Sequence, residues 1–228
     1  MIKYYGPNPN IISYVEYLCR DKTKILELGP GFTPFSKATH FCGWDQGDQN
    51  IDSTKHTVCD FSTQNLPYEN NEFDFIYCRH VLEDLYNPFL LVKEMSRVGK
   101  SGYIETPSPL SELCKNIDGG DSNVPWRGYH HHHSFVWSHN GVLCFVKKFP
   151  IIEYSLKINE ENIVKYLEKH PHSWNTYMVW KDTIPHKHFQ HDVDFKITST
   201  YSEFLIKNVL EQSISSNDTF YNNMNFSL

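Results

Sequence analysis

Short apolar runs follow one another through the first hundred residues, separated by glycine, proline and polar positions. Residues 11–20 place Ile11, Val15 and Leu18 at helical spacing, which predicts a lead-in helix packed on the core. Asn10 is its expected N-cap. The next runs are short and bounded by turn residues, as is typical of buried strands. They predict strands at residues 24–28, 40–45, 57–59 and 73–78.

The clearest helix boundaries enclose residues 88–98. Asn87 can cap this helix, a proline takes its first position, and Gly99 follows its end. A fifth strand is predicted at residues 103–106, where Pro107 then stops it. Because strands alternate with helices and turns at βαβ spacing, the pattern predicts an α/β fold with a mainly parallel sheet.

Beyond residue 110 the pattern weakens. Residues 110–140 are expected to form a loop or insert that ends in a hairpin of 134–137 and 141–147, and short helices are predicted at 160–169 and 202–213. Residues 213–228 are rich in serine and asparagine, which predicts a loosely ordered tail. The length suits one domain, 1–212, with residues 1–20 as its lead-in.

Charge and cysteine usage narrow the class of protein. The formal net charge of −6 argues against general binding to nucleic acid, which needs a clustered basic face. The six cysteines include no C-x-x-C pair and several lie in apolar runs, which favours reduced thiols and a cytoplasmic, intracellular protein. The first residues lack the apolar core of a signal peptide, and no run approaches 18 apolar residues. Neither a nucleic-acid nor a membrane partner is expected.

The strongest chemical signal is the turn after the first predicted strand, Ile-Leu-Glu-Leu-Gly-Pro-Gly at 25–31. Gly29 and Gly31 permit a sharp turn and a close approach of a ligand, and nucleotides bind at such turns in α/β sheets. An ordinary strand-to-helix turn is the alternative. The dinucleotide fingerprint requires a third glycine where Pro34 stands, and Asp45 comes earlier than its ribose-binding acid. A cofactor without a pyrophosphate is therefore favoured over NAD or FAD.

Further segments with candidate functional residues follow this turn along the chain. Asp45 ends the second predicted strand, Asp60 ends the third, Leu-Pro-Tyr follows at 66–68, and Phe-Asp-Phe-Ile-Tyr-Cys-Arg-His-Val-Leu-Glu-Asp occupies 73–84. In this order and spacing, residues 25–106 resemble the class I S-adenosylmethionine (SAM)-dependent methyltransferases. The resemblance implies a Rossmann-like fold, a mainly parallel seven-stranded sheet with helices on both faces, and SAM as the cofactor.

The resemblance also implies roles for individual residues. Those that would bind the cofactor are Glu27, Gly29 and Gly31 around the methionine part and ribose, Asp45 at the ribose hydroxyls, Asp60 and Phe61 at the adenine, and Cys78 with His80 near the sulfonium. Asp60 could instead be a turn residue. Two positions depart from the family pattern: Thr33 stands where a small residue or glycine is usual, and Asp84 replaces the second histidine of the usual motif.

A run of four histidines at 130–133 is the main feature of the second half. It could line an acceptor pocket, bind a metal or lie in a solvated loop. Adjacent residues of a strand face opposite ways, so at most two of the four would share a face, and no cysteine or aspartate lies nearby at ligand spacing. We therefore expect no metal. The residues assigned to the acceptor are Arg127, Tyr129, His131 and His133.

The function that follows is methyl transfer from SAM to an O or N atom of a small molecule, with a sugar or nucleotide-sugar favoured. The candidate catalytic residues are His80, Glu105 and His132. His80 is the preferred base because imidazole titrates near neutral pH, although it could instead cap a helix or pack on the cofactor. The alternatives are a nucleic-acid or protein methyltransferase, and a non-catalytic SAM-binding or partner-binding module. The oligomeric state does not follow from the sequence.

Overall fold

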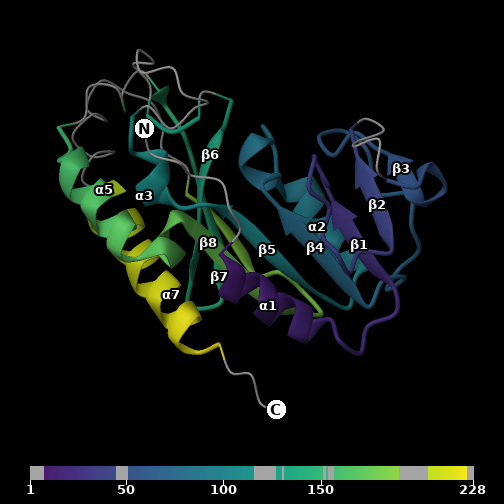
Figure 1. Cartoon of the computed structure of the whole chain (residues 1–228). Coiled ribbons are helices and arrows are strands. Elements are labelled where there is room, and N and C mark those ends of the chain that lie inside the picture. The colour runs from purple at the N-terminus through teal and green to yellow at the C-terminus, as the bar shows by residue number, and fades with distance from the viewer. Residues whose placement is uncertain are drawn as a thin grey trace.

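The computed structural model describes residues 8–44, 51–115, 127–129, 131–150, 153, 157–189 and 205–224. A six-stranded sheet runs through the molecule in the order β3-β2-β1-β4-β5-β8 (Figure 1). Its strands are β1 (Ile25–Leu28), β2 (His40–Gly43), β3 (His56–Val58), β4 (Phe75–Arg79), β5 (Ser101–Pro107) and β8 (Asn175–Lys181). The first five are parallel, and β8 runs antiparallel to β5. The predicted α/β class is confirmed.

Strand order determines where a ligand can bind. The chain leaves β1 toward β2 and β3 on one side, then crosses to β4 and β5 on the other. In open α/β sheets, ligands bind beyond the carboxyl ends of the strands where this reversal occurs. The residues that follow β1 and β4 therefore face the expected site.

The second half adds a separate three-stranded sheet of β6 (Ser134–His139), β7 (Val142–Lys147) and β9 (His186–Phe189). The predicted hairpin is present as β6 and β7, joined at Asn140 and Gly141, both with positive φ as tight hairpin turns require. The described strands are thus divided between two sheets instead of forming seven in one. Sequence patterns gave no sign of β8 or β9.

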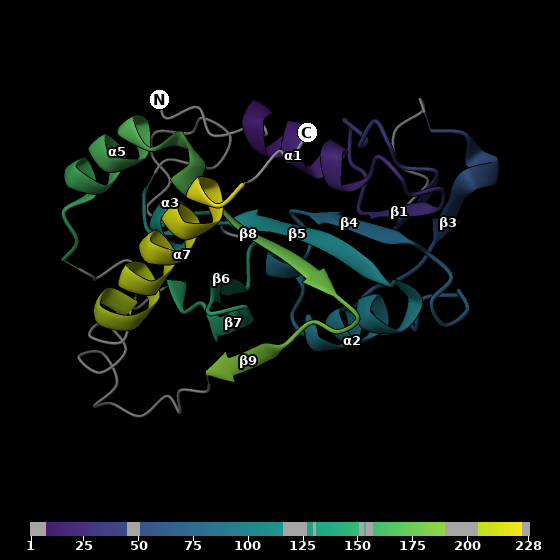
Figure 2. The same ribbon diagram turned by 90° about the horizontal axis from the view of Figure 1, so that it is seen from below.

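Helices cover both faces of the large sheet. The α-helices of the described chain are α1 (Pro9–Leu18), α2 (Phe89–Val98), α3 (Pro109–Glu112), α5 (Glu160–Lys169) and α7 (Glu211–Asn222). Three short 3-10 helices are η1 (Ser53–Lys55), η2 (Leu82–Asp84) and η3 (Pro171–Trp174), and η4 (Leu205–Leu210) is a π-helical turn. Figure 2 shows α1 on one face, and α2 with the small sheet on the other. The first helix is capped by Asn8, two residues before the expected Asn10.

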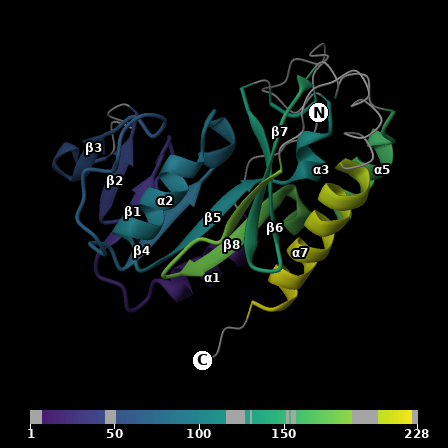
Figure 3. The same ribbon diagram turned by 180° about the vertical axis from the view of Figure 1, so that it is seen from behind.

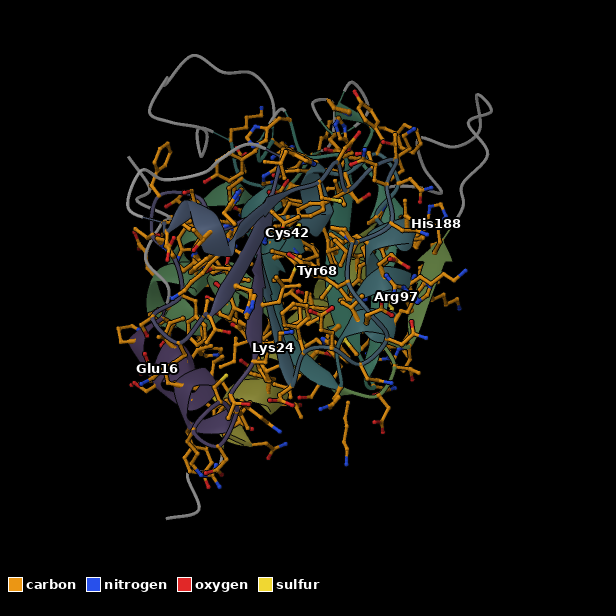
Figure 4. The ribbon with its side chains drawn as sticks, turned by 90° about the vertical axis from the view of Figure 1, so that its right-hand side faces the viewer. Glu16, Lys24, Cys42, Tyr68, Arg97 and His188 are labelled. Carbon is orange, nitrogen blue, oxygen red and sulfur yellow. The ribbon has the colours of Figure 1, made fainter. Side chains whose placement is uncertain are left out.

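The core divides along the same layers. Leu91, Val92 and Met95 of α2 pack with the sheet and with Phe145 of the small sheet, and Figure 3 shows α2 lying over β1 and β4. On this side Cys42 lies next to Tyr68, as Figure 4 shows. A second cluster joins α1 to the opposite face of the sheet. All six cysteines are buried free thiols.

The end of the described chain is ordered, contrary to expectation. Residues 211–222 form α7, in which Ser213 and Asn217 are buried. Trp137 of β6 donates a hydrogen bond from Nε1 to Gln212 Oε1 at 3.1 Å. The polar composition misled the prediction, because this helix is stabilised by packing on distant elements and not by an apolar stripe of its own. No helix among the described residues is long and apolar enough to cross a membrane.

Candidate active site

The glycine turn after β1 is shaped by contact with the segment after β4. Gly29 has φ +66°, and a Cβ there would lie 2.5 Å from Val81 Cγ2. Its N–H donates to Cys42 O of β2 at 2.8 Å. Gly31 has φ +55° but nothing would lie within 4 Å of its Cβ. Gly29 is thus required both by packing and by backbone conformation, whereas Gly31 is favoured by backbone conformation alone.

His80 stands directly after β4, with a φ of +54° that non-glycine residues rarely adopt. Its backbone N–H donates to Glu105 O at 2.9 Å, which ties it to the end of β5. Its ring lies between two buried carboxylates: Nδ1 is 3.5 Å from Glu83 Oε1 and Nε2 is 3.8 Å from Glu105 Oε1. Burial lowers the pKa of the imidazole, against the opposing effect of Glu105. His80 is therefore neutral at pH 7 and able to accept a proton.

Two adjoining cavities meet at this turn. One of about 290 Å³ is bordered by Phe61, Val81 and Asp84, and one of about 650 Å³ by Glu27, Tyr77 and Arg79. Both share the glycine turn and His80. Together they have the size of a small-molecule site. The first is largely apolar and aromatic and the second carries charged groups, so the cleft has two chemically different ends.

Glu27 is 3% exposed and borders the charged end. Its Oε2 accepts a hydrogen bond from Phe35 N at 2.8 Å. Burial raises the pKa of the Glu27 carboxyl to about 8, although this bond and Arg79 act in the opposite direction. A buried carboxyl that stays protonated until a cation arrives is suited to binding an ammonium group.

The other residues assigned to the cofactor lie in different positions. Phe61 borders the apolar end, next to Trp44. Cys78 is 1% exposed within β4, and burial raises its thiol pKa well above the usual value. Asp60 is exposed, and its carboxylate accepts from Ser62 N at 2.9 Å and from the Thr63 hydroxyl at 2.7 Å. Asp45 lies outside the described residues.

Glu105, proposed as a catalytic residue, is the centre of a buried network. Its Oε2 accepts from the Tyr103 hydroxyl at 2.6 Å, and its Oε1 accepts from Asn175 Nδ2 at 2.6 Å and Arg79 Nε at 3.1 Å. Although burial acts to raise the pKa of Glu105, His80, Arg79 and Tyr103 together lower it. It is therefore a fixed anion that holds His80 and Arg79. The contact with Asn175 of β8 could not be seen in the sequence.

His132 belongs to a second buried network. Its Nδ1 lies 2.7 Å from Glu112 Oε1, and the other oxygen of Glu112 accepts from Lys148 Nζ. The pKa of His132 is raised because Glu112, Glu83 and Asp84 outweigh its burial. Sequence reasoning missed Glu112 and Lys148, which have no pattern around them that marks them as functional.

The other histidines of the run at 130–133 make contacts that differ from one residue to the next. His131 Nε2 and His132 Nε2 both approach Asp84 Oδ1, at 3.7 and 3.4 Å. The His133 ring stacks on Tyr86, with centroids 3.7 Å apart. His130 lies outside the described residues. The expectation that neighbours in the run face opposite ways assumed a strand, but His131 and His132 lie in a turn, closed by a bond from His132 N to Tyr129 O at 3.2 Å.

Arg127 and Tyr129, assigned to the acceptor, lie deeper. Arg127 is 4% exposed, and its guanidinium donates to Leu113 O and Glu153 O at 2.8 Å and to Glu160 Oε1 at 2.6 Å. The Tyr129 ring packs on His132, with centroids 4.6 Å apart. Arg127 therefore joins segments of the second half to one another, and it borders neither of the two cavities.

Part of the chain is similar to known proteins. Residues 30–104, about a third of the chain, match the family model described as a methyltransferase domain. No curated protein matches the chain. Among solved structures, the YcgJ protein of Bacillus subtilis is 19% identical with a TM-score of 0.32, over 43% of this chain and 49% of that one.

Two further structures show the same partial likeness. A SAM-dependent methyltransferase of Mesorhizobium loti is 17% identical, with a TM-score of 0.30, over 40% of this chain and 50% of that one. A chain from the complex of the Haloferax volcanii Trm112 methyltransferase activator with a methyltransferase is 12% identical, with a TM-score of 0.41, over 76% and 91%. The chain spans about half the length of the first structures it matches.

The family match begins within the glycine turn and includes His80 and part of the lining of both cavities, which confirms the resemblance found in the sequence. Residues 30–104 are thus similar to methyltransferase domains, the sheet is Rossmann-like, and SAM is the cofactor of the class that the sequence resembles. The site fits that group: the Glu27 carboxyl and the Arg79 guanidinium border the end that would hold the amino-acid part, and Phe61 and Val81 offer an apolar surface for the adenosine end.

Proposed function

We propose that this protein transfers a methyl group from SAM to an oxygen or nitrogen atom of a small molecule, with a sugar or nucleotide-sugar as the preferred acceptor class. The observation that carries the proposal is the meeting of the glycine turn and His80 in one divided cleft at the switch point of the sheet. Acidic and imidazole groups adjoin its acceptor side, which suits a polyhydroxylated molecule better than the phosphate backbone of nucleic acid.

The chain's own residues would perform three tasks. When bound, SAM supplies an electrophilic methyl group on its sulfonium. Glu27 and Arg79 would hold the charged end of the cofactor. His80, which borders both cavities, would accept the proton of the acceptor group, and Glu105 would fix its position through the backbone and the ring. The aromatic residues at the rim would exclude water.

The first test uses the wild-type protein. Calorimetry should show binding of SAM, and incubation with panels of sugars, nucleotide-sugars, nucleic acids and proteins should release S-adenosylhomocysteine with the first two. SAM binding without turnover on any panel would favour a non-catalytic module, and turnover on nucleic acid or protein would replace the acceptor class.

The second test is His80→Ala. We expect the affinity for SAM to stay within a few-fold and turnover to fall by about a hundredfold or more, the usual scale for loss of a general base. His188→Ala is the control, because His188 lies on β9 of the small sheet, packs near Phe89 and borders neither cavity (Figure 4). If turnover survives while SAM affinity collapses, His80 belongs to the cofactor pocket, and Glu105 or His132 becomes the candidate base.

A further inference from the structure

Three potential metal ligands from two distant segments converge at the edge of the cleft. They are Asp84 Oδ1 from η2 and the Nε2 atoms of His131 and His132, all within 4.8 Å of one another. Asp84 also borders the smaller cavity, together with His80. The cluster therefore adjoins the space that would receive the reacting groups.

The spacing is that of ligands around an ion. The two imidazole nitrogens stop 3.4 and 3.7 Å from Asp84 Oδ1, and this buried oxygen makes no hydrogen bond to any described residue. A charge-assisted hydrogen bond would bring such atoms to about 2.7–2.9 Å. Ligands about 2.1 Å from a tetrahedral ion lie roughly 3.4 Å apart. A shared cation accounts for these distances better than a direct ion pair does.

The groups behind the cluster are arranged as they are around metal-bound histidines. Glu112 Oε1 lies 2.7 Å from His132 Nδ1, which fixes the ring and directs Nε2 toward Asp84. Lys148 in turn holds the other oxygen of Glu112. Histidines that bind metals usually donate their second nitrogen to a carboxylate in this way, which sets the tautomer and the ring orientation.

Buried acidic groups gather around the cluster. Glu83 and Asp84 of η2 are buried or half-buried, and Glu112 of α3 is buried beside His132 and Lys148. The two oxygens of Glu83 are buried and make no hydrogen bond within the described part of the chain.

We propose that Asp84, His131 and His132 bind a divalent first-row transition metal ion, with zinc as the test ion. Two imidazoles and one carboxylate suit such ions better than Mg²⁺ or Ca²⁺, which prefer oxygen ligands. Three protein ligands leave coordination positions open. If the proposed function holds, those positions would take oxygen atoms of the acceptor and place them beside the cofactor. The expectation of no metal considered only residues near the histidines in sequence; the fold adds Asp84.

The test measures metal binding directly, on tag-free protein that has been stripped with a chelator and dialysed. Titration with ZnCl₂ in a calorimeter, with metal analysis after gel filtration, should give one tightly bound ion per chain. Asp84→Asn and His131→Ala should each weaken zinc binding by at least tenfold. His139→Ala should leave it unchanged, because His139 lies at the far end of β6.

Asp84→Asn is decisive, because a histidine run that binds zinc by itself, as an affinity tag does, would not need the aspartate. Unchanged zinc affinity in this variant, or no zinc binding by the wild type, would overturn the proposal. Circular dichroism establishes whether each variant is folded. If Asp84→Asn does not fold, His131→Ala still tests the site, because the His131 side chain is half exposed and its loss should leave the fold intact. A wild type that binds SAM but not zinc refutes this proposal alone, and the reverse result refutes the proposed function alone.

Discussion

The two halves of the molecule differ in where their ion pairs lie. In residues 8–107, Lys24 and Lys100 pair with carboxylates near the surface, with side chains 37% and 55% exposed, and the buried pair of Arg79 with Glu105 belongs to the cleft. In the second half, Arg127 and Lys148 pair inside the protein, with side chains 3% and 1% exposed, beside the exposed pair of Lys165. The first half is thus organised by apolar patterning around a sheet, whereas the second depends on specific buried charge pairs.

This difference has an energetic consequence. Exposed pairs contribute little to stability, because water screens them and the side chains lose entropy. A buried pair contributes modestly while it is intact, but removal of one partner leaves an uncompensated charge in a poorly polarisable interior. We therefore expect the second half to be the more sensitive to single charge deletions.

The largest effect should come from Lys148→Met. This change strands the buried carboxylate of Glu112, and it should lower the free energy of unfolding by about 3–5 kcal/mol. Lys100→Met, the matched change in the first half, should cost about 1 kcal/mol or less, because its pair with Asp74 is exposed to water. Urea unfolding of both variants measures the difference. Equal effects would remove the distinction between the halves.

A smaller effect, in the first half, should come from Gly29→Ala. The left-handed backbone costs an alanine about 1–2 kcal/mol, and the contact with Val81 adds about 1–3 kcal/mol of overpacking. Gly31→Ala carries only the backbone cost, since its Cβ would meet open space. Thermal and urea unfolding should rank the two variants in that order, and the opposite ranking would mean that the turns do not touch as described.

The next prediction tests the cofactor role of Asp45, which lies outside the described residues. Asp45→Ala should weaken SAM binding by about 1.5–3 kcal/mol, or ten- to a hundredfold, the usual contribution of hydrogen bonds to a charged group. Asp74→Ala is the control. Asp74 lies just before β4, at the end of the sheet away from the cleft, where it binds Lys100 and Thr23. Calorimetry that finds both affinities unchanged would remove Asp45 from the site.

The last prediction concerns the pH dependence of stability. The pKa of Glu27 is raised by burial to about 8 in the folded state, above its unfolded value, so the folded protein keeps a proton that the unfolded chain loses. Stability should therefore fall as pH rises from about 4.5 to about 8, by at most about 1.4 kcal/mol per pH unit from this group. Glu27→Gln should flatten this part of the profile. Identical slopes for both proteins in urea unfolding would contradict the assignment.

Much of the first half could be predicted because its information is local. The turn at Gly29 and Gly31 follows an apolar run, and the helix at Phe89–Val98 has proline and glycine at its ends. In the second half, Asn140-Gly141 marks the hairpin in the same local way. Each signal lies within a few residues of the element that it defines, so the α/β class followed from the order of these signals.

The sequence by itself determined the mainly parallel α/β sheet, the glycine turn and the presence of His80 after the strand at Phe75–Arg79. Only the tertiary structure decided what His80 and the histidine run contact. Asn175 reaches Glu105 from a strand 70 residues away, and Asp84 meets His131 and His132 across the cleft. The physical reason is that local steric and hydrophobic preferences act between neighbours in the chain, whereas pairing of buried charges depends on which segments the packed core brings together.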